Sequence, residues 1–292
     1  MHPAPSVIIF TTLSGLGFGL LAWMGLGHPN VTGMPAFMFY FVAYALSVGG
    51  LLASTFHLGN KMNAIYAFSQ WRSSWLSREG IMAVLTLLVF APVAIAQVFL
   101  NTTLPALGFI GSVFAMITVF TTSMMYTQLK TVPRWNMFPL NPALFLLYAI
   151  AGGALLAGEG RLAGWLIAAV TILQIIAWIA GDARVAASGT DKGTATGLGR
   201  IGRVRMLESS NTARNYVMDE MVHTIGRKHA QKLRVIATLL IGIFPALILI
   251  LLPSGLLITV IALTSHVIGV AAGRWLFFAE AEHVVGMYYS RG

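Results

Sequence analysis

Two residues with titratable side chains lie at neighbouring ends of two long apolar stretches. His57 ends the stretch 36–58, and Glu79 opens the stretch 79–100. Histidine titrates near neutral pH, and a carboxylate at membrane depth is a candidate functional group by default. Because successive membrane-crossing helices run antiparallel, we expect both side chains at the same membrane face. Such a pair can relay protons, or hydrogen-bond the carbonyl oxygen of a flat apolar ligand such as a quinone.

Polar and aromatic residues fill the segment between them, STFHLGNKMNAIYAFSQWRSSWLSREG (54–80). Several of these residues have an ordinary structural interpretation. His57 suits the negative end of a helix dipole, Ser77 is a predicted N-cap, and Trp71 and Trp75 fit an interfacial aromatic belt. In the functional interpretation the segment moves protons beside an apolar ligand, and the candidate residues are Ser54, His57, Trp71, Arg72, Arg78 and Glu79.

Another charged group follows the last apolar stretch, within GRWLFFAEAEHVVGMYY. Arg274 lies about one turn inside the predicted membrane edge, and Glu280, Glu282 and His283 lie at that edge or beyond it. We expect Arg274 to pair with Glu280 or with a neighbouring helix, or to extend to the interface as long basic side chains do.

The histidines are poorly placed to hold a haem, which needs two of them at matching depth. His266 lies about ten residues into the last stretch, roughly 15 Å deeper than His57 at the helical rise. We therefore expect no haem. There is also no Ser-His-Asp arrangement, zinc motif or phosphate loop, so the sequence does not indicate a self-sufficient enzyme.

The composition is that of an integral membrane protein. Of 292 residues, 57% are hydrophobic and 9% are charged, whereas soluble domains carry about 25% charged residues. Cysteine is absent, which excludes disulfides, thiolate metal sites and iron–sulfur ligands in this chain. The first apolar run has no basic segment or small-residue cleavage site around it, so we interpret it as a membrane span and not as a removable signal.

Eight apolar stretches are long enough to be membrane helices, each needing about 20 residues. We predict an all-α bundle of eight transmembrane helices, in which Pro245 kinks the seventh and a neighbour satisfies the freed carbonyl. We expect Gly15, Gly17 and Gly19, and likewise Gly269 and Gly273, to permit close helix packing. The stretches are 5–27, 36–58, 79–100, 105–128, 141–158, 162–181, 234–253 and 256–279.

The basic residues predict the orientation of this single transmembrane domain, 1–292. Loops after even-numbered stretches hold fifteen of the 18 Lys and Arg residues, and loops after odd-numbered ones hold only Arg161. By the positive-inside rule, the even loops and both termini are cytoplasmic. The net charge of +9 then reflects contact with anionic lipid and not with nucleic acid. Cytoplasmic loop 182–233 is predicted mobile over 187–199 and helix-like from Arg200, facing either a soluble partner or lipid.

Four segments resemble the dimethyl sulfoxide reductase membrane-anchor family. They are HPAPSVIIFTTLSGLGFGLL, FHLGNKMNAIYAFSQWRSSWLSREG, YTQLKTVPRWNMFPLNP and GRWLFFAEAEHVV. The resemblance implies the third subunit of a bacterial inner-membrane complex, with a molybdopterin catalytic subunit and a four-cluster, ferredoxin-like iron–sulfur subunit as partners. It implies a bound quinone, ubiquinone or menaquinone, with His57 and Glu79 at its site. Molybdopterin and the clusters would belong only to the partners, which would dock on Lys61, Gln70, Lys130 and Arg134.

Two branches of that family fit. One is the dimethyl sulfoxide reductase anchor, with exported partners and a quinol as electron donor. The other is the sulfite dehydrogenase anchor, with cytoplasmic partners and a quinone as electron acceptor. Because the expected quinone site lies on the cytoplasmic side, and RWLFFAEAEHVV resembles the second branch more, we favour sulfite oxidation. A secondary transporter and a haem-containing anchor are the remaining alternatives, although no internal repeat supports a transporter.

Overall fold

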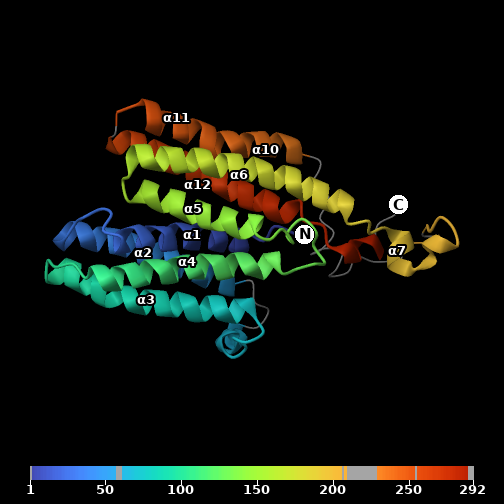
Figure 1. Cartoon of the computed structure of the whole chain (residues 1–292), viewed down its shortest axis with the longest axis horizontal. Coiled ribbons are helices and arrows are strands. Elements are labelled where there is room, and N and C mark those ends of the chain that lie inside the picture. Colours follow the sequence, from blue (N-terminus) through green and yellow to red (C-terminus); the bar gives the residue numbers. More distant parts are fainter. Residues whose placement is uncertain (1, 57–60, 206, 209–228, 254, 289–292) are drawn as a thin grey trace.

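The computed structural model describes residues 2–56, 61–205, 207–208, 229–253 and 255–288, without the side chains of 61–64 and 287–288. Within these residues the regular elements are all helices, so the predicted all-α membrane bundle is confirmed as a class. Figure 1 shows them as a long bundle of nearly parallel rods.

The eight predicted stretches are each helical, with ends within a few residues of those expected. Seven are long and apolar enough to cross a membrane, whereas α5 has only 17 residues. The bounds are α1 (Pro5–Gly25), α2 (Gly33–Thr55), α3 (Trp75–Phe99), α4 (Pro105–Thr127), α5 (Leu140–Leu156), α6 (Gly160–Ala187), the continuous stretch α10 (Ala230–Thr238), η3 (Leu239–Ile243) and α11 (Phe244–Leu251), and α12 (Leu256–Ala279).

Short helices gather at one end of the bundle, which we call the basic end. There α1, α3, α5 and α10 begin, and α2, α4, α6 and α12 end (Figure 1). The short helices are η1 (Lys61–Phe68), α7 (Lys192–Thr196), η2 (Leu198–Arg200) and η4 (Val284–Tyr288). Because α6 continues to Ala187, loop 182–233 begins later than predicted. Most of its predicted helical part lies outside the described residues.

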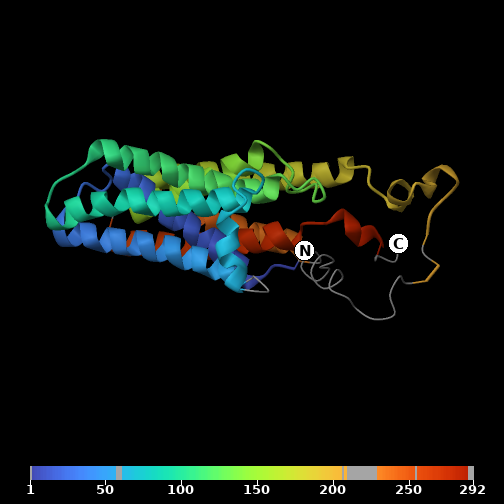
Figure 2. The same ribbon diagram turned by 90° about the horizontal axis from the view of Figure 1, so that it is seen from below.

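Helix α1 lies in the middle of the bundle and packs against α2, α4, α5 and α12 (Figures 1 and 2). Glycines allow this close approach. A Cβ atom at Gly17 would overlap the backbone of Ser47 in α2, and one at Gly19 would overlap Ala149 in α5. The packing prediction is confirmed for both. It is wrong for Gly15, where a Cβ atom would meet nothing within 4 Å.

Around Pro245 the predicted satisfaction of the freed carbonyl is confirmed, and the kink stays a prediction. The α-helical hydrogen bonds give way to a π-helical turn at η3 just before the proline. Proline has no N–H, so it cannot donate to the carbonyl of Ile241, four residues earlier. His266 Nδ1 of α12 lies 2.6 Å from that carbonyl, and the Ser265 hydroxyl donates to Leu240 O at 3.0 Å. Neighbouring side chains thus satisfy the freed backbone.

Candidate functional site

The start of α3 sets the position of Glu79. The N-cap is Ser74, whose hydroxyl accepts from the Ser77 N–H at 3.4 Å. The prediction of Ser77 as cap is therefore wrong, and Glu79 lies in the second turn. The Ser77 hydroxyl instead accepts from the Gln70 N–H at 3.2 Å and donates to Ala67 O. These bonds hold the end of η1 and the following turn against α3.

The Glu79 carboxylate points into the bundle towards α4. It is 3% exposed, and it accepts a hydrogen bond from the Thr122 hydroxyl. That hydroxyl also lies 3.0 Å from Thr118 O. Glu79 forms no ion pair with any cation that the structure describes. One turn earlier Trp75 packs edge-on against Phe120, with ring centroids 6.1 Å apart. The site is thus a buried carboxyl between α3 and α4, near the basic end.

The two arginines next to Glu79 in sequence face elsewhere. Arg78 donates to Trp71 O at 2.9 Å and to Arg72 O at 2.7 Å, and its guanidinium lies 4.3 Å from the centre of the Trp75 ring. Arg72 is exposed and lies over the Trp71 ring at 5.3 Å. Both arginines therefore shape the turn before α3 and leave the carboxylate unpaired.

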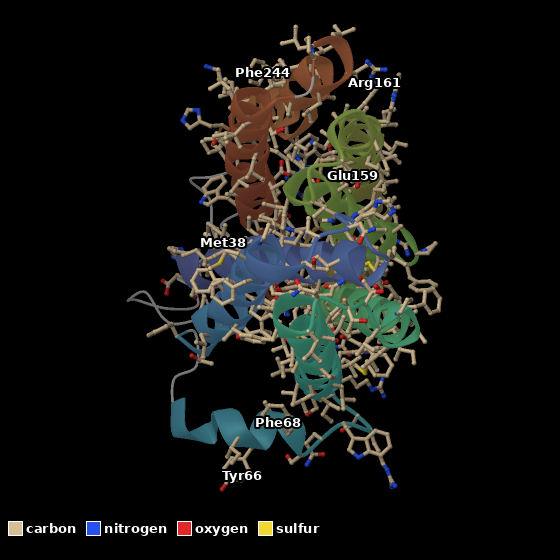
Figure 3. The ribbon with its side chains drawn as sticks, turned by 90° about the vertical axis from the view of Figure 1, so that its left-hand side faces the viewer. Met38, Tyr66, Phe68, Glu159, Arg161 and Phe244 are labelled. Carbon is tan, nitrogen blue, oxygen red and sulfur yellow. The ribbon has the colours of Figure 1, made fainter. Side chains whose placement is uncertain are left out.

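Large apolar side chains are exposed beside this turn. Ile65, Tyr66, Phe68 and Trp71 all lie open on η1 and the segment after it. Figure 3 shows Phe68 on the side of η1 that faces the bundle and Tyr66 pointing away from it. A Cβ atom at Gly80 would lie 3.2 Å from the Phe68 ring, so this ring covers α3 next to Glu79.

The remaining predicted residues are dispersed. His57 lies outside the described residues, as does the side chain of Lys61. The Ser54 hydroxyl bonds to Leu51 O within α2, at 2.7 Å. Gln70 and Lys130 are exposed. The pairing of His57 with Glu79 therefore stays a prediction.

A network of ion pairs joins the helices of the C-terminal half at the basic end. Arg134, with its side chain only 13% exposed, donates to Asp182 at 2.6 Å. Arg234 donates to Asp182 at 2.7 Å and to Glu280 at 2.8 Å. Glu280 thus pairs with Arg234, and the predicted Arg274–Glu280 pair is wrong.

Arg274 instead points into the bundle, where it is buried. Its guanidinium lies 3.7 Å from the centre of the Phe145 ring and 5.1 Å from that of Tyr148. It forms no ion pair with any described carboxylate. It therefore does not extend to the interface as a long basic side chain at the membrane edge would.

A cavity of about 20 Å³ lies beside Arg274, between α1, α4, α5 and α12. Its polar lining includes Thr12, Thr122, His266 and Arg274. Thr122 therefore touches both this cavity and Glu79. Sequence reasoning missed this group as a unit. The available signal was the spacing of His266 and Arg274, because positions i and i+8 both fall within the stripe, roughly 100° wide, that a helix turns towards its core.

Comparison with known proteins places these features in a family. The family model "DMSO reductase anchor subunit (DmsC)" matches residues 1–279. A sulfite dehydrogenase subunit of Allochromatium vinosum is 30% identical to this chain, over 99% of each. No solved structure matches. The chain therefore belongs to the DMSO reductase anchor subunit family, and is an integral membrane anchor subunit of a molybdenum oxidoreductase complex.

Proposed function

We propose that this protein passes electrons from sulfite, oxidised by a cytoplasmic molybdopterin subunit, to a quinone in the membrane. The electrons travel between them through a four-cluster iron–sulfur subunit. Oxidation of sulfite to sulfate releases two electrons, and the quinone takes up these two electrons and two protons to become a quinol. The name of the A. vinosum relative supports the choice of sulfite. The observation that carries the proposal is the Glu79 carboxyl near the basic end, which is buried and forms no ion pair with the cations that the structure describes.

The surroundings of Glu79 fit proton delivery better than direct contact with the quinone ring. The carboxylate is sealed between α3 and α4, and the cavity behind Thr122, at about 20 Å³, is far smaller than a quinone ring. The exposed rings of Phe68 and Trp71 offer an apolar surface that a lipid-dissolved quinone can reach. We place the ring there, with His57 as donor to a quinone carbonyl and Glu79 as the source of a proton.

The distribution of basic residues supports an orientation of the protein in the membrane. We propose eight membrane spans, α5 included, with both termini and the basic end in the bacterial cytoplasm. The partner subunits then dock at the basic end, where Lys61, Gln70 and Lys130 lie. Arg134 is engaged within the chain by Asp182, so its contribution to docking is indirect.

The experiment compares Glu79→Gln and His57→Ala in membranes that contain the whole complex. Sulfite-dependent quinone reduction should fall at least tenfold in each, since proton-transfer groups contribute about 100-fold or more. Sulfite-dependent reduction of an artificial acceptor should stay unchanged, because that acceptor takes electrons before the quinone. Glu159→Gln is the matched control, since Glu159 lies at the opposite end, bonded to His28. Unchanged quinone reduction in both variants would refute the site.

The family name itself supports a second candidate, a quinol-oxidising dimethyl sulfoxide reductase anchor. The same membranes distinguish the two directions. Sulfite-dependent quinone reduction supports the first proposal, and quinol-dependent reduction of dimethyl sulfoxide supports the second.

A further inference from the structure

The interior cavity gathers polar atoms that lack partners. The Thr12 hydroxyl, His266 Nε2 and Arg274 Nε are buried and have no hydrogen-bond partner within the described protein. Thr12 comes from α1, whereas His266 and Arg274 come from α12, and all three line the same cavity. Buried polar groups are costly when unpaired. Their convergence on one small space indicates a polar ligand.

The size of the cavity defines that ligand. A water molecule needs about 10–15 Å³ of such space and two to four polar partners. The cavity has about 20 Å³, which suits one water molecule. The rings of Phe145 and Tyr148 form the α5 wall, and the Tyr148 hydroxyl is already engaged by Gln174 at 2.9 Å.

The hydrogen-bonding types of the lining atoms are complementary to one water. Arg274 Nε only donates, and a threonine hydroxyl both donates and accepts. A water can therefore accept from Arg274 Nε and the Thr12 hydroxyl and donate to Thr122 Oγ1. His266 lies eight residues, roughly 12 Å along α12, deeper than Arg274, so its Nε2 is left out of this set.

We propose that this cavity binds one structural water, which couples Arg274 to Glu79 through the Thr122 hydroxyl. The water donates to Thr122 Oγ1, so the single threonine proton stays available for the Glu79 carboxylate, which this hydroxyl contacts in the structure. When Glu79 gives up its proton, the Arg274 guanidinium stabilises the resulting negative charge along this chain. Arg274 is then a positioning residue, distant from the quinone ring.

Glu79 and Arg274 lie at similar depth, and the water connects them. Glu79 lies four residues from the start of α3, and Arg274 lies five residues from the end of α12. At about 1.5 Å per residue, both are roughly 6–8 Å inside the basic end. Neither forms an ion pair with a described residue, although a buried charge without compensation is costly. The water and Thr122 provide the compensation without direct contact.

The kinetic part of the proposal rests on the proposed function, whereas the water site does not. The test therefore has two measurements on the intact complex. The first is an electron-microscopic map at a resolution that shows ordered water. We expect one density peak within hydrogen-bonding distance of Thr12, Thr122 and Arg274. A map without this peak would overturn the proposal.

The second measurement uses two isosteric substitutions of buried threonines. Thr12→Val removes a partner of the water. Thr171→Val in α6 is the control, because the Thr171 hydroxyl bonds within its own helix to Ile167 O at 2.8 Å, and this residue is outside the lining of the cavity. We expect sulfite-dependent quinone reduction to fall about fivefold in Thr12→Val, the typical effect of one hydrogen bond, with a larger solvent isotope effect and an unchanged artificial-acceptor rate. Thr171→Val should match the parent.

Equal rates in the two variants would overturn the coupling. If Glu79→Gln leaves quinone reduction intact, the proposed function fails, and the map alone still decides the water site.

Discussion

His266 Nδ1 lies 2.6 Å from the carbonyl oxygen of Ile241, the carbonyl to which Pro245 cannot donate. This contact joins α12 to the π-helical turn of the neighbouring stretch. His266 also lines the interior cavity, and its Nε2 is buried with no hydrogen-bond partner among the described residues. One side chain thus takes part in both the packing of two helices and the polar interior.

The contact predicts a coupling between two substitutions. His266→Ala should destabilise the protein by about 2–4 kcal/mol, because it leaves the Ile241 carbonyl unpaired and creates a cavity. In a Pro245→Ala background the cost should be smaller, since alanine at position 245 supplies an N–H to that carbonyl. Thermal unfolding of the four variants in detergent, as a double-mutant cycle, measures the coupling. Additive effects would contradict it.

Adjacent glycines in α2 should respond differently to alanine. A Cβ atom at Gly50 would lie 2.6 Å from the backbone nitrogen of Ser14 in α1, whereas one at Gly49 would meet nothing within 4 Å. We expect Gly50→Ala to lower stability by about 1–3 kcal/mol through overpacking, and Gly49→Ala to be neutral or slightly stabilising. Unfolding temperatures and yields of the purified protein test the two variants directly.

The Thr122 hydroxyl is predicted to matter more than its neighbour in α4. Thr122→Val removes the described hydrogen bond to Glu79, so quinone reduction should fall about tenfold, as expected for a hydrogen bond to an ionised group. Thr121 bonds only to Thr118 O, at 2.8 Å, and Thr121→Val should retain activity. Quinone reduction rates in membranes with equal amounts of complex test this. Equal losses would indicate a packing effect instead.

Hydropathy predicted the helices well because membrane spans are set by length and apolarity, both visible in the sequence. It also placed Glu79 near the basic end. It could not predict that Glu79 faces α4, because the direction of a side chain depends on helix rotation. Arg274 shows the same limit. Its nearest acid in sequence, Glu280, pairs with Arg234, which follows a long loop and enters from another helix.

Docking of the partner subunits should depend on exposed cations of the basic end. Lys130 is exposed, whereas Arg134 is held by Asp182. We expect Lys130→Glu to weaken co-purification of the iron–sulfur subunit, more strongly at low than at high salt, because exposed charges are screened. Arg161→Glu, at the opposite end, is the control. Unchanged recovery of the iron–sulfur subunit would show that Lys130 does not contribute to the interface.

Arg234 should be the most sensitive member of the ion-pair network. Its guanidinium donates to Asp182 and Glu280 at once, and the Glu280 side chain is only 6% exposed. Lysine cannot span both carboxylates in this fork-like geometry. Removal of one partner from a buried pair costs about 3–5 kcal/mol, because the other charge is left uncompensated.

We therefore expect Arg234→Met to lower the unfolding temperature markedly and Arg234→Lys to lower it by less. Arg234→Met combined with Glu280→Gln should recover much of the loss, because that pair of substitutions removes the stranded charge. Thermal unfolding of the three variants measures the order. If the double variant is no more stable than Arg234→Met, the network does not act through the Glu280 charge.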